Sequence, residues 1–493
     1  MKQAMLTLGA LAAVFSNPQV QLLFSTNTGA FAIADIRLTA AAHANGIVPP
    51  GYPDAALVNA GRELFFNETF DGNGRTCGTC HPESNNLTLD PRFIASLPDD
   101  DPLFVAERGG HNPLARHFEK PALMREVGLI LENTNGFDDL EHSFTMRSVP
   151  HLLALPTSVT PPGGGNDGTT LPPDERTGWG GDGAPVDRNL PDPLLGRLRD
   201  FTVGAIRQHF TRTLNREAGV DFRLPSDFEV NAIAAFMLPL GRQTEFDDFT
   251  QIQLFDPRAE RGRLNYLGTG LANGIPCNAC HFNGGANTDP NFDFPASVSP
   301  PAFESTNRSF APRIEELIDQ PGDIVAAHDN PFDDGFGHGT SLFNVPTVIE
   351  AADTGPFFHG NQIDTVEGLV SFYATQRHLR NGEVLPPVVG LNGSQVANVA
   401  AFLRVLNADE NLRSAIELFD QAEQLSRKRD RKTDLSLARG EISDAITVLE
   451  GGNLHFREVV PALKLARRLA FDRFGLARSR EMLARCRTLM IQR

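Results

Sequence analysis

The pentapeptide Cys-X-X-Cys-His occurs twice in this chain, at Cys77–His81 and at Cys277–His281. This spacing is the attachment signature of a c-type haem, in which each cysteine forms a thioether to the porphyrin. The histidine that follows the second cysteine reaches the iron as an axial ligand. The chain has 5 cysteines in 493 residues, so two chance copies are not plausible. The sequence therefore predicts two covalent haems, attached through Cys77, Cys80, His81, Cys277, Cys280 and His281.

Two other classes of site use a Cys-X-X-Cys pair, namely zinc knuckles and thioredoxin-like redox centres. A structural zinc site needs four ligands, and no further cysteine lies near either motif to supply a fourth. Cys486 is the one cysteine outside the motifs, so a disulfide framework is excluded. Haem attachment is favoured over both alternatives.

Covalent haem attachment takes place outside the bacterial cytoplasm, so an export signal is expected. Lys2 is followed by an apolar run from Ala4 to Phe15, which is typical of a weak signal peptide. We expect residues 1–44 to form an export signal or N-terminal segment, and the protein to be periplasmic. No later stretch reaches about 18 apolar residues, so we expect no membrane span in the mature protein.

The formal net charge of −17 argues against nucleic acid and anionic membranes as partners. The charge is uneven, because residues 409–493 hold 17 Lys+Arg against 13 Asp+Glu. Apolar residues in this part recur at helical spacing over 411–425, 435–450 and 459–490. We predict a helical extension at 409–493, which is either a solvated cap on the fold or a docking site for an acidic partner.

The remainder of the chain has the pattern of an internal duplication. A glycine lies 16 residues before the first motif cysteine in one half (Gly61) and 15 residues before it in the other (Gly262). A Val-Pro pair follows, with its proline 73 residues after that cysteine in the first half (Pro150) and 69 in the second (Pro346). Helical periodicity is also present at 198–218, 226–241, 364–375 and 394–407. Each half should thus contain a helix, a haem loop and a Val-Pro loop.

The second half resembles the bacterial di-haem cytochrome c peroxidase and MauG family. The runs that carry the resemblance are Asn344–Val348, Gly355–Gly360 and Thr365–Tyr373, and a weaker similarity extends over residues 50–405. The resemblance implies a mainly α fold with an N-terminal cytochrome c-like haem domain at 45–250 and a C-terminal one at 251–408. The helical extension at 409–493 lies outside it.

In this family the second haem takes a distal ligand fourteen residues after the histidine of the Gly-Pro-Phe-Phe-His loop. The ligand is methionine in the peroxidases and tyrosine in MauG-like members, and here the position is Tyr373. No methionine lies between Met237 and Met482. A phenolate is a hard anionic donor that lowers the haem potential. Two alternatives remain open: Tyr373 packs on an apolar helix face, or His378 is the ligand instead.

The family also has a tryptophan between its haems, and Trp179 is the only tryptophan of this chain. It is either an electron bridge or a core residue. The glutamine and glutamate with which the peroxidases cleave the O–O bond fall near Phe201 and Thr211 here. Neither acid–base residue is present at those positions, so Gln208 and His209 are the candidates that could substitute.

A distal pocket lined by phenylalanine instead resembles that of the rubber oxygenases, which bind dioxygen at such a haem. His111 or His117 could supply a distal histidine for the first haem, although both lie in a polar run typical of surface loops. The family often holds calcium between its domains. Calcium is an option that only the resemblance offers, because the sequence has no dense carboxylate run.

These patterns predict a periplasmic di-haem oxidoreductase, with peroxidase-type reduction of hydrogen peroxide as the first hypothesis. The alternatives are MauG-like oxidation of a partner protein, a di-haem oxygenase and a non-enzymatic electron-transfer cytochrome. The expected partners are hydrogen peroxide and a small electron-donor protein, a cytochrome or a cupredoxin, or else a substrate protein.

Overall fold

The computed structural model describes residues 55–107, 121–131, 146–155, 198–269, 274–294, 309–310, 343–374, 390–425, 428–454, 456–471 and 475–493. Trp179, His111, His117, His378 and the predicted export segment at 1–44 lie outside these ranges. The described part of the chain is mainly helical, as predicted, with three small two-stranded sheets. None of its helices combines the length and the apolar character that crossing a membrane requires.

The first half is built from short helices around the first motif. Its helices are α4 (Ala55–Asn67), α5 (Cys77–Cys80), α6 (Pro91–Ile94), α8 (Pro121–Val127), α10 (Leu198–His209) and α11 (Asp227–Met237). Two 3-10 turns, η1 (Glu83–Asn85) and η2 (Pro102–Glu107), lie between them. Strand β1 (Leu129–Leu131) pairs antiparallel with β2 (Met146–Ser148), with Ile130 opposite Arg147.

The helix predicted over 198–218 is shorter than expected, because α10 ends at His209. The side-chain amide of Asn73 donates to the carbonyl oxygens of His209 and Thr211, both at 2.9 Å. Carbonyls at a helix end need such partners once the helical hydrogen bonds stop. The helix predicted over 226–241 is present as α11, which begins with a capping box between Ser226 and Glu229.

The second half and the C-terminal extension form a continuous set of helices. The elements are β3 (Gln253–Leu254), α12 (Pro257–Tyr266), α13 (Cys277–Cys280), η4 (Phe282–Gly284), β4 (Ser309–Phe310), β5 (Phe343–Asn344), α15 (Val366–Ala374), α17 (Gly393–Gln424), α18 (Lys428–Gly451), α19 (Val459–Leu469), α20 (Leu476–Met490) and β6 (Ile491–Gln492). The predicted boundary at 408 falls inside α17, so no linker separates the extension from the second half.

The two halves repeat one close helix crossing, of α4 with α11 in the first half and of α12 with α17 in the second. A Cβ atom on Gly61 would lie 1.8 Å from the carbonyl oxygen of Ala232. A Cβ atom on Gly262 would lie 1.9 Å from that of Asn398. Only glycine allows two backbones to approach this closely. The duplication seen in the sequence is therefore present as a duplicated contact.

Aromatic pairs sit one helical turn after each glycine. The ring centroids of Phe65 and Phe236 are 5.1 Å apart, and those of Tyr266 and Phe402 are 5.3 Å apart. Each pair belongs to a different cluster of buried apolar residues. In the described residues, the two helix crossings therefore belong to separate apolar cores.

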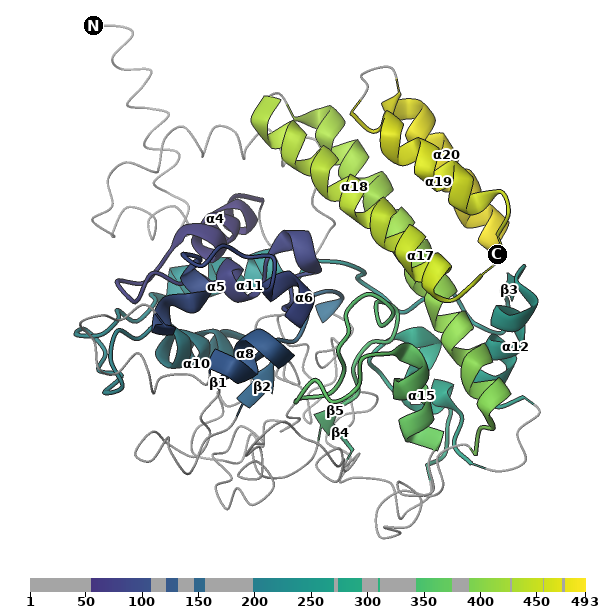
Figure 1. The fold of residues 1–493 in the computed structure, drawn as a ribbon, viewed down its shortest axis with the longest axis horizontal. Coiled ribbons are helices and arrows are strands. Elements are labelled where there is room, and N and C mark those ends of the chain that lie inside the picture. The colour runs from purple at the N-terminus through teal and green to yellow at the C-terminus, as the bar shows by residue number, and fades with distance from the viewer. Residues whose placement is uncertain are drawn as a thin grey trace, which may run out of the picture.

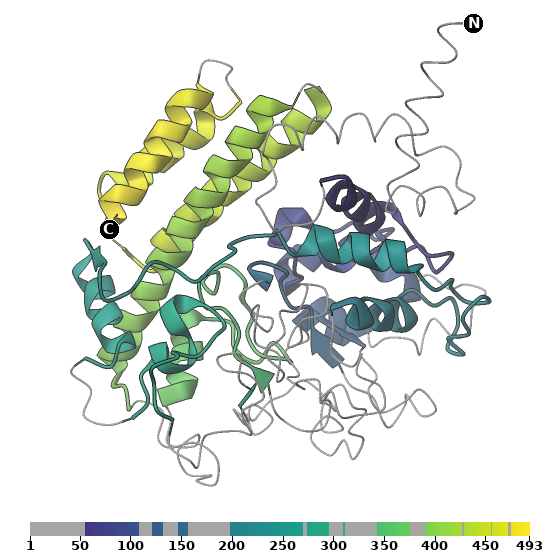
Figure 2. The same ribbon diagram turned by 180° about the vertical axis from the view of Figure 1, so that it is seen from behind.

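The extension belongs to the second of these cores. Buried side chains of α18, α19 and α20 join those of α12 and α17 in one apolar cluster, and β6 pairs antiparallel with β3. Figures 1 and 2 show α17 and α18 as long neighbouring helices, with α19 and α20 packed on their outer side. At the other end of the long pair, α18 contacts η1 of the first half. The extension thus touches both halves.

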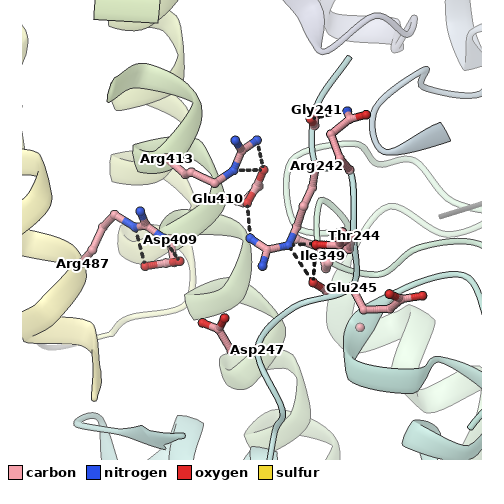
Figure 3. A network of polar contacts seen from close by, with 12 residues as sticks. Gly241, Arg242, Thr244, Glu245, Asp247, Ile349, Asp409, Glu410, Arg413 and Arg487 are labelled. Atoms are coloured by element: carbon pink, nitrogen blue, oxygen red, sulfur yellow. Dashed lines mark hydrogen bonds and ion pairs between the residues drawn. The ribbon is translucent and has the colours of Figure 1, made fainter. Parts of the chain in front are cut away.

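Buried ion pairs fasten this arrangement, as Figure 3 shows. Asp409 and Glu410 are fully buried in the middle of α17. Arg487 of α20 donates two hydrogen bonds to Asp409, at 3.0 and 2.9 Å. Arg242 donates to Glu410 at 3.1 Å from the segment that joins the two halves, and Arg413 donates to it at 2.7 Å. The positive charges of Arg413 and Arg487 are therefore neutralised inside the molecule.

We predict that Gly262→Ala disrupts the second half, because its new methyl group would overlap the backbone of Asn398. The matched control is Gly440→Ala on α18, where a Cβ atom has nothing within 4 Å. A glycine-to-alanine change in an exposed helix interior stabilises by about 0.5–1 kcal/mol. Urea denaturation should show a large loss for the first variant and a small gain for the second. Equal effects would contradict the proposed close crossing.

Candidate haem sites

The two Cys-X-X-Cys-His motifs have the same local fold. Each forms a single helical turn, α5 or α13, that ends at the histidine. The histidine amide donates to the carbonyl of the first cysteine at 3.0 Å for His81 and 2.9 Å for His281. The backbone angles of these histidines are φ −121°, ψ 64° and φ −113°, ψ 67°. The turn places both cysteines of a motif on one face, because they are three residues apart.

Both motif histidines have a backbone partner for one ring nitrogen. His81 Nδ1 lies 2.8 Å from the carbonyl oxygen of Leu87, and His281 Nδ1 lies 2.8 Å from that of Pro346. A carbonyl can only accept, so Nδ1 carries the proton and Nε2 has the free lone pair. Burial lowers the pKa of each imidazole to about 4, so both rings are neutral at pH 7. This state and orientation fit an axial ligand to haem iron.

None of the four motif cysteines takes part in a disulfide, and all four are half-buried. Burial raises the pKa of the Cys77 and Cys277 thiols to about 12. Cys77 packs on the core of the first half and Cys277 on that of the second. Across the described ranges, no group of three or more His, Cys, Asp or Glu side chains is arranged to hold a metal ion.

The two sites differ in the residues that contact the motif histidine. Tyr266 is buried and donates its hydroxyl to the carbonyl of His281 at 2.7 Å. The corresponding aromatic residue of the first half is Phe65, whose ring lies 6.1 Å from that of His81. In addition, the Val-Pro loop holds His281 directly through Pro346, whereas His81 is held by Leu87 within its own haem loop. The second motif is therefore the more firmly fixed of the two.

The structure brings the predicted residue His209 close to the first motif. The pKa of His209 is lowered to about 3, first by burial and then by the charges of Arg75, Arg216 and His81. Its half-buried side chain, like that of Gln208, comes from the last turn of α10. These two assignments remain predictions, but His209 is near enough to His81 for their charges to interact.

The positions at which the family has its acid–base pair contain no substitute for them. Phe201 is half-buried and packs on the first core. Thr211 is 3% exposed, and its hydroxyl donates to the carbonyl of Thr213 at 2.6 Å. The hydroxyl of Thr211 is thus occupied within its own turn.

His151 is a further residue of the first site that the sequence interpretation missed. Burial lowers its pKa to about 4, and the charge of His81 is the next cause. The signal was available in the sequence, because His151 directly follows Val149 and Pro150 of the first Val-Pro loop.

Tyr373 lies beside the second motif. Burial raises the pKa of its phenol, and the charges of Cys280 and Cys277 raise it further, so the phenol is near both thiols. Its ring centroid is 5.2 Å from that of Phe372 and 6.3 Å from that of Phe358. Tyr373 as an iron ligand remains a prediction.

Loops from the two halves meet between the motifs. Ser148 of β2 donates its amide to the carbonyl of His359 at 2.7 Å and its hydroxyl to that of Phe358 at 3.0 Å. Asn361 donates to the carbonyl of Val127 at 2.7 Å. Asn86, next to Leu87, donates to the carbonyl of Asp353 at 3.1 Å. The junction is therefore built from hydrogen bonds to backbone carbonyls.

Buried carboxyl groups gather behind this junction. The amide of Asn411 donates to Asp353 at 2.8 Å and to Glu441 at 3.2 Å. Burial raises the pKa of Asp353 to about 7, that of Glu441 to about 8 and that of Asp444 to about 6. The negative charge of Asp353 also raises the pKa of Glu441. The cluster therefore holds protons at neutral pH.

Comparisons with known proteins give a distant similarity to a solved structure. No family model and no curated protein matches the chain. A solved structure described as a MauG-like protein associated with microbial copper homeostasis is similar at 16% identity and a TM-score of 0.34. The match covers 72% of this chain and 90% of that one. The functional conclusion below rests on the residues of this chain.

We predict that Glu441→Gln stabilises the protein at pH 8. The folded carboxyl has a raised pKa, so the folded state binds more protons than the unfolded state and stability falls as pH rises from about 4.5 to about 8. The variant should gain on the order of 1 kcal/mol at pH 8 and lose part of this slope. Urea denaturation at pH 5 and pH 8 measures both.

The matched control is Glu450→Gln on the same helix, whose side chain is 52% exposed and pairs with Lys464. It should change stability by less than about 1 kcal/mol. A loss of stability in Glu441→Gln at pH 8 would refute the assignment of a buried, protonated carboxyl.

Proposed function

We propose that the protein is a periplasmic di-haem c-type oxidoreductase of the peroxidase type, which reduces hydrogen peroxide at the first haem with electrons supplied through the second. The observation that carries the proposal is the repeated motif fold, in which neutral His81 and His281 each direct Nδ1 to a backbone carbonyl. A backbone carbonyl that accepts this hydrogen bond orients the imidazole for metal ligation. Haem, when bound, supplies the redox chemistry with peroxide.

At the first site, the proposed role of His209 is to move a proton. Its lowered pKa keeps the ring neutral, so a ring nitrogen is available to accept a proton from hydrogen peroxide. Gln208, on the same helical turn, would orient the peroxide by hydrogen bonding. Trp179 is the proposed bridge between the haems.

At the second site, the proposed ligand is the phenol oxygen of Tyr373. A hard anionic oxygen ligand lowers the reduction potential and so favours storage of an oxidising equivalent. The hydroxyl of Tyr266 fixes the other side of the site by holding the carbonyl of His281. Electrons would come from a small cytochrome or cupredoxin. Calcium between the halves is a further proposed cofactor, offered by the family resemblance alone.

A second candidate function is dioxygen chemistry at the first haem. It is favoured by Phe201 and Thr211, which stand where the peroxidases have a glutamine and a glutamate. An oxygenase would form a stable dioxygen adduct in the ferrous state without added peroxide.

The test begins with the exported holoprotein and a pyridine haemochrome count. We expect two haems per chain, and one in each of the variants Cys80→Ser and Cys280→Ser. Hydrogen peroxide is then titrated into the diferric and half-reduced forms with a reduced cytochrome as donor. Rapid spectral change with turnover of the donor supports the peroxidase proposal. No reaction with peroxide would refute the peroxidase proposal. The ferrous protein would then be exposed to dioxygen to test the oxygenase alternative.

We predict that Tyr373→Phe changes the second haem alone. Loss of the anionic ligand should abolish that haem's low-spin ferric signal and raise its reduction potential. Tyr266→Phe is the matched control, because it removes a phenol near the same two thiols but not at the ligand position. Electron paramagnetic resonance and a potentiometric titration give the readouts. An unchanged low-spin signal in Tyr373→Phe would rule out the tyrosine ligand.

A further inference from the structure

We infer that the two haem sites are connected for electron transfer by a chain of bonded and packed groups that runs from His81 through Thr88, Ser148 and Phe358 to Tyr373. The inference rests on the proposed function in requiring a haem at each motif and Tyr373 as the ligand of the second. It uses residues of the junction between the halves and is a separate route beside the proposed Trp179 bridge.

The first link starts at the motif histidine. His81 donates Nδ1–H to the carbonyl of Leu87 at 2.8 Å. The next residue, Thr88, is buried and donates its hydroxyl to the carbonyl of Val149 at 2.5 Å. Two hydrogen bonds and a short stretch of backbone therefore join the imidazole of the first site to the first Val-Pro loop.

The second link crosses from one half to the other. Ser148 precedes Val149 in the chain and makes two hydrogen bonds to the second half. Its amide donates to His359 at 2.7 Å, and its hydroxyl donates to the carbonyl of Phe358 at 3.0 Å. Both contacts are at ordinary hydrogen-bond distances, so no gap interrupts the chain here.

The third link is aromatic. The ring of Phe358 lies 4.8 Å from that of Phe372, which lies 5.2 Å from that of Tyr373. The direct separation of the Phe358 and Tyr373 centroids is 6.3 Å. These distances are within the range of packed aromatic pairs. Tyr373 is the proposed ligand of the second haem, so the chain ends at the second site.

The backbone is held in an unfavourable conformation at both ends of this chain. Leu87 has φ +55° and Phe358 has φ +68°, in the left-handed region that bulky residues rarely adopt. Such strain persists where the surrounding structure requires it, and it clusters at functional positions. At Leu87 it presents the carbonyl to His81, and at Phe358 it presents the carbonyl to Ser148 while the ring packs on Tyr373.

The step that the chain would carry is a single electron transfer. The second haem site loses one electron and the first gains it, and no bond or proton is exchanged. Contiguous packed groups are the physical carriers of coupling between distant sites. The peptide and aromatic groups of this chain are therefore the candidates to set the rate of that transfer.

Two variants break the chain with little change of shape. Thr88→Val removes the hydroxyl of the hydrogen bond to Val149, and Phe358→Leu removes the ring next to Tyr373 while keeping its backbone carbonyl. The matched controls are Thr202→Val, whose hydroxyl donates to the carbonyl of Leu198 at 2.9 Å, and Phe292→Leu, whose ring packs near Cys280 but off the chain.

The measurement is the rate of inter-haem electron transfer after photochemical injection of one electron into the diferric holoprotein. Each on-chain variant should slow it, because each removes a bonded or packed group from the route. The controls should leave it unchanged. Haem spectra, reduction potentials and thermal melting of each variant show that both sites are intact.

Wild-type rates in both on-chain variants, with intact spectra, would overturn the inference, and so would a slowing in Trp179→Phe alone. If Phe358→Leu fails to load haem, Thr88→Val decides the question. A haem count below two per chain would defeat the proposed function and this inference together. If the on-chain variants slow electron transfer between the haems but the protein does not react with peroxide, the inference stands and the peroxidase function is rejected.

Discussion

Both candidate sites depend on one hydrogen bond, from the Nδ1 of the motif histidine to a backbone carbonyl. A one-turn helix alone would leave each imidazole free to rotate, and the carbonyls of Leu87 and Pro346 remove that freedom. The two acceptors differ in origin, which makes the sites unequal. Pro346 belongs to a loop 65 residues further along the chain, so the second site forms only when its half has folded. Leu87 lies six residues after His81, so the first site is largely local.

The rest of the fold holds the two unequal sites in fixed positions. Gly61 and Gly262 fix a helix crossing in each half, and each crossing supports its own core. α17 continues beyond the second crossing and carries Asp409 and Glu410. Asp409 accepts hydrogen bonds from an arginine of α20, and Glu410 accepts them from an arginine of the segment between the halves and from one of α17 itself. Removing one partner of an ion pair this deeply buried strongly destabilises the fold, because it leaves an unpaired charge in the interior. The extension is therefore part of the frame that positions the sites.

Much of this could be predicted from the sequence, because the informative signals are local. The haem motifs and the repeated glycines are spacing patterns that the structure shows as equivalent contacts in the two halves. The Val-Pro repeat differs, because Pro346 accepts a hydrogen bond from His281 whereas Leu87 takes that place for His81. The early end of α10 could not be predicted, since it depends on Asn73, a residue 136 positions away from the carbonyl of His209 that it binds. The sequence offered a signal for His151 in its position after the Val-Pro pair, but its proximity to His81 depends on tertiary structure. The change in charge at residue 408 does not coincide with the end of a helix, because α17 continues to Gln424, and the domain boundary there stays a prediction.

The charge pattern of the extension shows why composition is a weak guide to partners. A local excess of positive charge suggested a docking face, but Arg487 and Arg493 point their charge inward at Asp409, and Arg480 pairs with Asp420 and Glu423. An arginine that is paired with a carboxylate of the same molecule contributes little electrostatic attraction toward an acidic partner. These three carboxylates belong to residues 409–493 and are already counted in the charge balance of that stretch, so the net excess of positive charge remains on other side chains. A docking face for an acidic partner therefore stays a prediction, and Arg480, Arg487 and Arg493 are not the residues that would form it.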